Sequence, residues 1–250
     1  MELLRSDQQL TRPKRSHSLW HSAGVRLHLL PRGVLDLTDP VPPHVDRIDE
    51  LVVELRHTYL STVESLAMLV EAKDATTGHH LERCRTHATA LARLVDPSLA
   101  TDEVQHGYLL HDIGKMGIPG KILTKPSRLS SREMSIMRRH PGLGVRMVSP
   151  MQVLDPRAVD VIHHHHERFD GTGYPSGLRG DAIPLAARIF SVVDAFDSMI
   201  NDRPYRRALP IDRAVHELLA GAGTQFDPEI VAVFVGLVSG LAEPLATTTP

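Results

Sequence analysis

Residues 108 to 117 read Tyr-Leu-Leu-His-Asp-Ile-Gly-Lys-Met-Gly, an apolar run that leads into an adjacent histidine and aspartate. The pair offers a metal one neutral nitrogen ligand and one anionic oxygen ligand, and a carboxylate can bridge two ions. If the segment is helical, Lys115 lies four residues after His111 and three after Asp112, so the three side chains share one face. Taken alone, such a pair is more often the end of a helix beside a solvated lysine.

If this chain binds a metal, its composition requires imidazole and carboxylate ligands and not thiolate. The chain has 250 residues, with 16 histidines but only one cysteine, Cys84. A single cysteine excludes a disulfide scaffold and any zinc site with several thiolates, and it fits a reducing compartment. The formal net charge of −2 gives no overall field that would attract a nucleic-acid polymer or a membrane.

Apolar residues outside this segment recur at steps of three and four, and no stretch alternates with a period of two. Ser130 and Glu133 have the spacing of a capping box, and Asp227 marks the start of the last helix. We therefore predict an all-α domain. The expected helices cover residues 81–95, begin near 101 and 131, and cover 156–166, 184–200, 211–220 and 228–240.

The chain is expected to divide into four segments. Residues 1–45 show no sustained period and end in a proline-rich linker, so we predict that they are poorly ordered. Residues 46–73 form an amphipathic lead helix that packs on the domain or on a second copy, which favours a homodimer. Residues 74–240 form the domain and 241–250 a tail.

Neither a leader nor a membrane anchor is evident in the sequence. The longest apolar run, residues 231–241, contains two polar or glycine interruptions and is shorter than the roughly 20 residues that span a bilayer. The N-terminal residues lack the apolar stretch of a secretory signal. We expect a cytoplasmic protein that does not insert into membranes.

Further groups of polar residues suggest a site. Four consecutive histidines occupy 163–166; on a helix they diverge by about 100° per residue, so they cannot all bind one ion. Asp194 and Asp197 lie in an apolar helix, where an unpaired carboxylate costs several kcal/mol, so each should meet a metal or an arginine. The glycines and proline of 171–175 predict a turn.

These motifs together resemble the HD-GYP family of metal-dependent phosphohydrolases, over about residues 46–235. The resemblance implies an HD-domain helical bundle with the family's C-terminal extension. It also implies hydrolysis of cyclic di-GMP to pGpG, with further cleavage to GMP left open. The matching stretches are HLER from 80, LLHDIGK from 109, RHP from 139, HHERFDGTGYP from 165, DAFD from 194, DRPYR from 202 and GAGTQFDP from 221.

The resemblance also implies the roles of individual residues. The metal ligands would be His80, His111, Asp112, His140, His165, His166 and Asp194, with Asp112 bridging two ions and taking part in catalysis. Lys115 would stabilise the phosphate or protonate the leaving oxygen, Arg203 and Arg206 would hold phosphate oxygens, and Tyr174 would shape the pocket wall. Imidazole and carboxylate ligands suit iron or manganese, with zinc, magnesium or nickel as alternatives.

The sequence departs from the family pattern at three positions. Thr76 stands where some members carry a glutamate for a third metal, so we predict two ions. His79 replaces the usual glycine before the first ligand, and the spacing to Arg83 assigns that ligand to His80. Ser176 replaces an aspartate that often follows the turn. This change concerns a contact within the turn and does not remove a metal ligand.

Two alternative functions are also consistent with the sequence. One is a signalling adaptor that binds partners such as GGDEF-domain proteins through the turn at Tyr174. The other is a hydrolase of the same family that acts on another cyclic dinucleotide or nucleotide.

Overall fold

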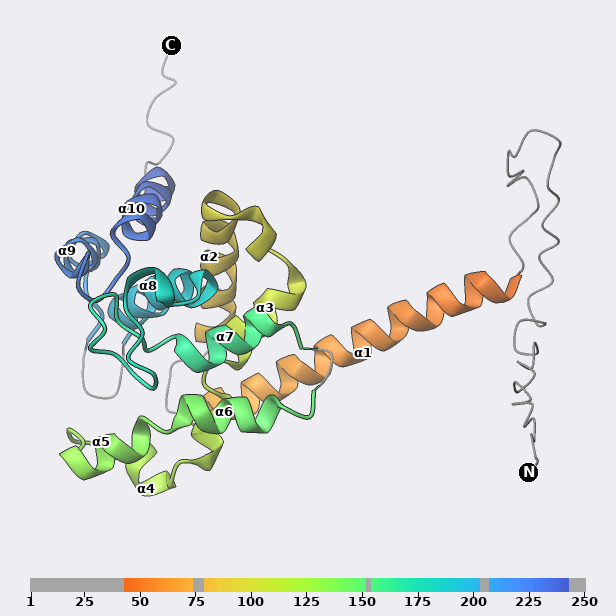
Figure 1. Ribbon diagram of the computed structural model, residues 1–250, viewed down its shortest axis with the longest axis horizontal. Coiled ribbons are helices and arrows are strands. Elements are labelled where there is room, and N and C mark those ends of the chain that lie inside the picture. Colours follow the sequence, from red (N-terminus) through yellow and green to blue (C-terminus); the bar gives the residue numbers. More distant parts are fainter. Residues whose placement is uncertain (1–42, 74–78, 152–153, 203–206, 243–250) are drawn as a thin grey trace, which may run out of the picture. The chain divides into compact units, whose positions relative to one another are not determined.

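The computed structural model describes residues 43–73, 79–151, 154–202 and 207–242, and no strand occurs among them (Figure 1). The all-α prediction is confirmed. The α-helices are α1 Pro43–Lys73, α2 His80–Val95, α3 Asp102–Leu110, α4 Gly120–Leu123, α5 Ser131–Met137, α6 His140–Val148, α7 Pro156–His164, α8 Leu185–Ile200, α9 Ile211–Gly221 and α10 Pro228–Ala242. Three short 3₁₀ helices are η1 Pro97–Leu99, η2 Ile113–Gly117 and η3 Gly180–Ala182.

Several predicted boundaries need correction. The lead helix α1 begins at Pro43 and not at residue 46, in keeping with the preference for proline in the first helical turn. Residues 1–42 of the segment predicted to be poorly ordered lie outside the described residues, as do residues 243–250 of the predicted tail. α7 ends at His164, two residues before the predicted end.

α8 lies at the centre of the main hydrophobic core. It packs against α2, α7, α9 and α10 (Figure 1). The rings of Tyr108 from α3 and Phe190 from α8 stack at 5.2 Å, and Phe196 meets Phe234 of α10 edge-on. Because α8 is buried along most of its length, any polar side chain that it carries inward needs a partner there.

A second core cluster involves the C-terminal part of α1. Val63, Ala67 and Val70 recur at steps of four and three residues, so they form one buried stripe. This stripe packs with Leu110 of α3 and Ile162 of α7. None of the helices in the described ranges combines the length and the apolar character that crossing a membrane requires.

Glycine allows η2 to lie directly against α6. A Cβ atom at Gly114 would overlap the backbone carbonyl of His140 and lie 2.5 Å from the amide nitrogen of Gly144. This close approach places the beginning of α6 beside the turn that follows α3, and so brings two polar segments of the sequence together.

Candidate metal centre

The histidine and aspartate pair lies where α3 ends. The α-helix stops at Leu110 and η2 follows, so the α-helical face considered for His111 to Lys115 does not form. In a 3₁₀ helix residues three apart are eclipsed, which still places Lys115 beside Asp112. Lys115 Nζ lies 2.6 Å from Asp112 Oδ2, and His111 Nε2 lies 3.2 Å from the same oxygen.

One group of ligand atoms surrounds the other oxygen of Asp112. His140 Nε2 lies 3.3 Å from Asp112 Oδ1, and His165 Nε2 lies 3.9 Å from it. Atoms from these three residues and from His166 all lie within 4.8 Å of one another. We call these four residues group A. His140 begins α6, and His165 and His166 directly follow α7, so this group joins two helix ends.

A second group lies on the side of Asp112 Oδ2. His80, His111 and Asp194 contribute ligand atoms within 4.8 Å of one another, and we call them group B. His80 Nε2 lies 3.6 Å from Asp194 Oδ1. His80 begins α2, and Asp194 projects from the middle of α8. The structure thus places all seven predicted ligands in two groups, with the Asp112 carboxylate between them.

Backbone carbonyls orient three of the imidazoles. The Nδ1 atoms of His111, His140 and His165 lie 2.8, 2.9 and 3.1 Å from the carbonyl oxygens of Tyr108, Met137 and Val161. A carbonyl oxygen only accepts, so each Nδ1 donates its proton and leaves Nε2 with a free lone pair. This arrangement is common for histidines that bind metal through Nε2.

The protonation states of Asp112 and of three group A histidines also fit a divalent cation. Burial works against ionisation of Asp112, but the charges of Lys115 and His111 outweigh it and hold the pKa of this carboxyl well below its ordinary value. Burial lowers the pKa of His165 to about 3 and also lowers the pKa of His140 and His166. For His111, burial is outweighed by Asp112, and its pKa is raised. The ionised carboxylate of Asp112 and the neutral imidazoles of His140, His165 and His166 are in the states that bind metal. The imidazole of His111 favours its proton and would release it on binding a metal.

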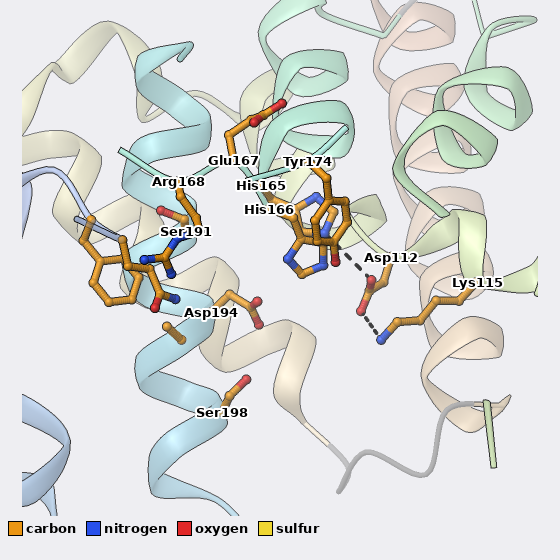
Figure 2. A pocket seen from close by; sticks show the side chains of 13 residues that line it. Asp112, Lys115, His165, His166, Glu167, Arg168, Tyr174, Ser191, Asp194 and Ser198 are labelled. Atoms are coloured by element: carbon orange, nitrogen blue, oxygen red, sulfur yellow. Dashed lines mark ion pairs between the residues drawn. The ribbon is translucent and has the colours of Figure 1, made fainter. Parts of the chain in front are cut away.

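A cavity of about 360 Å³ opens beside group A (Figure 2). Figure 2 shows Lys115 and the imidazoles of His165 and His166 around Asp112, with Asp194 approaching from α8. Tyr174 lines this cavity as expected, and its ring stacks on His166 at 4.8 Å. The remaining lining residues are Glu167, Arg168, Ser191, Ala195, Ser198, Gln225 and Phe226.

Comparison with known proteins identifies the family of this domain. The HD domain family matches residues 64–230, which include every group A and group B residue. The chain belongs to this family. Within it, the chain is an HD-GYP protein, as its motifs predicted, and a curated relative named cyclic di-GMP phosphodiesterase response regulator aligns with 71% of its length.

Two curated relatives and one solved structure show how far the similarity of this HD domain extends. A cyclic di-GMP phosphodiesterase response regulator of Xanthomonas campestris is 39% identical over 71% of this chain and 48% of the relative. A 3′3′-cGAMP-specific phosphodiesterase of Vibrio cholerae is 36% identical over 74% of this chain and 36% of the relative. An HDG"Y"P protein from Bdellovibrio bacteriovorus superimposes with a TM-score of 0.54 and 25% identity, covering 67% of this chain and 54% of that one. The chain therefore spans about half or less of the curated relatives' length.

Two predicted residues lie outside the described part, and the histidines that were not predicted as ligands lie outside the ligand groups. Arg203 and Arg206 are not among the described residues. His163 and His164 belong to neither ligand group and lie at the end of α7. His79 is exposed, whereas His80 is buried in group B.

Two carboxylates have roles that sequence reasoning did not assign. Glu167 is buried and accepts hydrogen bonds from the backbone amides of Ser176 and Leu178, at 2.7 and 3.2 Å, which fixes the loop that carries Tyr174. Asp197 forms an ion pair with Arg83, and an arginine was one of the two partners that the sequence predicted for it. For Asp197 the available signal was its position among apolar neighbours, which requires a partner but does not name it. Glu167 lies between His166 and Arg168 and carried no such signal.

Proposed function

We propose that this HD domain is a metal-dependent phosphodiesterase that hydrolyses cyclic di-GMP to linear pGpG. The observation that carries the proposal is the position of Asp112, with one oxygen toward His111 and the other toward His140. A carboxylate with one oxygen toward each ligand group could be shared by two cations. Relatives that bear the name cyclic di-GMP phosphodiesterase support the choice of substrate.

Each ligand group would hold one divalent ion, with Asp112 shared between them. Group A offers three imidazoles and group B offers two imidazoles and the carboxylate of Asp194. Such nitrogen and oxygen donors suit iron or manganese, with zinc, magnesium or nickel as alternatives. When bound, a pair of ions of this kind neutralises phosphate charge and lowers the pKa of water, so that a nucleophile forms at neutral pH.

The chain's own residues supply the remaining parts of the reaction. Hydrolysis adds the oxygen of one water to phosphorus and breaks the bond from phosphorus to the ribose 3′-oxygen, which leaves with a proton. The Lys115 ammonium, which Asp112 holds in the cavity at 2.6 Å, can donate a proton to this oxygen or a charge-assisted hydrogen bond to the phosphate. Tyr174 forms the wall against which the substrate lies. Arg203 and Arg206 are proposed to hold phosphate oxygens through their guanidinium forks.

Turnover measurements test the proposal. Protein purified without oxygen and loaded with Mn²⁺ or Fe²⁺ is incubated with cyclic di-GMP, and the products are separated. We expect pGpG, and any GMP would show a second cleavage. An unchanged rate in His111→Ala or Asp112→Ala would contradict the assignment of the site.

Two other functions are tested by the same experiment. The similarity to a 3′3′-cGAMP-specific relative favours cyclic GMP-AMP as the second candidate substrate, and parallel assays with both dinucleotides give the preference. If metal-loaded protein hydrolyses neither, an adaptor that binds GGDEF-domain partners becomes the better hypothesis. In that case binding should be saturable and lost in Tyr174→Ala. A homodimer through α1 is a further proposal, which sedimentation can test.

A further inference from the structure

His80 differs from the other oriented imidazoles of the site in the partner of its Nδ1 atom. This atom lies 2.7 Å from Oδ2 of Asp197, whereas His111, His140 and His165 use backbone carbonyls. His80 is the first residue of α2. A side chain from another helix takes the place of a carbonyl there.

Asp197 is itself held firmly. Arg83 Nε lies 2.6 Å from its Oδ1, Arg83 Nη2 lies 3.1 Å from its Oδ2, and the Asn201 side-chain amide donates to Oδ1 at 3.2 Å. The side chain of Asp197 is only 1% exposed. A carboxylate buried to this extent and hydrogen-bonded through both oxygens has one stable orientation.

The helical spacing places ligands and supports side by side. Asp197 lies three residues after Asp194 on α8, and Arg83 lies three residues after His80 on α2. The two helices pack against each other, so one turn of each carries a ligand and the next carries its support. The other ring nitrogen of His80, Nε2, then lies 3.6 Å from Asp194 Oδ1.

We propose that Asp197, fixed by Arg83, is a positioning residue that holds His80 as the Nδ1-protonated tautomer and directs Nε2 into group B. The proposal extends the proposed function, because it assumes that group B binds a metal ion. An anionic acceptor on Nδ1 also makes Nε2 a better donor to a metal. Loss of such a partner typically lowers metal affinity about 10- to 100-fold.

Two variants and a control test this role. Asp197→Asn keeps the size of the side chain but loses its charge, and Arg83→Gln leaves Asp197 in place without its main support. Asp155→Asn is the matched control, because Asp155 also pairs with an arginine, Arg157, but caps α7 outside both ligand groups. Circular dichroism shows whether each variant is folded.

The first readout needs neither metal nor turnover. In metal-free protein, long-range ¹H–¹⁵N correlation spectra report the tautomer of His80, assigned with the His80→Gln variant. We expect the Nδ1-protonated form in the unmodified chain and in Asp155→Asn, and a mixture of tautomers in Asp197→Asn. A wild-type His80 protonated on Nε2 would overturn the proposal.

The second readout is the affinity for Mn²⁺, measured by competition with a chelator. We expect Asp197→Asn to weaken one binding site about 10- to 100-fold and to leave the other unchanged. Arg83→Gln should change the same site by a smaller factor. Equal affinities in Asp197→Asn and Asp155→Asn would overturn the proposal, as would no Mn²⁺ binding by the wild-type chain. If Mn²⁺ binds as expected but no cyclic dinucleotide is hydrolysed, the proposed function fails and the positioning role stands.

Discussion

Lys115 and Asp112 form a close charged pair in the candidate site, and their contact determines how the lysine can act. The ammonium reaches the cavity because Asp112 holds it there. The sequence predicted this proximity from a spacing of three residues, although it assumed an α-helix where the structure has a 3₁₀ turn.

Replacing Lys115 should separate chemistry from metal binding. We expect Lys115→Met to lower kcat about 100- to 10,000-fold, the usual range for loss of a proton donor, while metal content stays unchanged. Lys121→Met on α4 serves as the control, since Lys121 is exposed and does not line the cavity. Steady-state kinetics and metal analysis of both variants measure these effects. An unchanged kcat in Lys115→Met would contradict the role of Lys115 as a proton donor.

Gly114 determines whether η2 and α6 can approach each other. Because a Cβ here would overlap the backbone of His140, we expect Gly114→Ala to destabilise the fold by about 3 kcal/mol. Gly142→Ala is the control: it lies within α6, and its added methyl would meet no atom within 4 Å. That change should be neutral or stabilising by up to about 1 kcal/mol. Urea unfolding measures both, and equal effects would contradict this account of the packing.

At the scale of elements, the helices that begin with a clear capping signal were predicted correctly from the sequence. Ser130 accepts from the Glu133 amide and Glu133 from the Ser130 amide, as the capping-box spacing predicts. Asp227 likewise caps α10. The turn from α3 into η2 was not predicted, because the same residues fit an α-helical face equally well. The start of α6 depends on contact with η2, which spacing along the chain does not report.

The capping box of α5 makes a pH-dependent contribution to stability. Lys125 and Ser130 hold the pKa of the Glu133 carboxyl at about 2. The ordinary value of a glutamate, about 4.3, applies to the unfolded chain. Since the folded pKa is the lower one, the contribution is complete above about pH 4.3 and is lost as the pH falls toward 2. The free energy of unfolding should therefore differ more between wild type and Glu133→Gln at pH 7 than at pH 3. A difference independent of pH would contradict this assignment.

At the scale of the whole molecule, the candidate site joins segments that are distant in sequence. Its ligands come from the ends of α3 and α7, the starts of α2 and α6, and the middle of α8. Single motifs could not show this convergence, and the resemblance to a family was needed to collect the ligands. The sequence predicted a metal or an arginine beside Asp197 but could not name Arg83, because that contact is set by the packing of α2 on α8. The role of Glu167 was not predicted, because its partners are backbone amides of a loop.

Because the ligands come from five helices, metal should stabilise the native state as a unit. Cations that bind only the folded chain stabilise it by about 2.7 kcal/mol for each site at a concentration 100 times the dissociation constant. Thermal unfolding with Mn²⁺ should therefore occur at a higher temperature than in EDTA, and Asp112→Ala should reduce this difference. Equal melting temperatures with Mn²⁺ and EDTA would show that the groups do not hold metal in the folded protein.

The most direct test of the central claim is the number of metal ions bound per chain in three proteins. Elemental analysis of Mn²⁺-loaded wild type, His140→Ala and Asp112→Ala compares the intact centre with the loss of a group A ligand and the loss of the shared carboxylate. The account predicts about two ions per chain in the wild type, about one in His140→Ala, and fewer than one in Asp112→Ala. Two ions retained in Asp112→Ala would contradict the claim that this carboxylate lies between two metal sites.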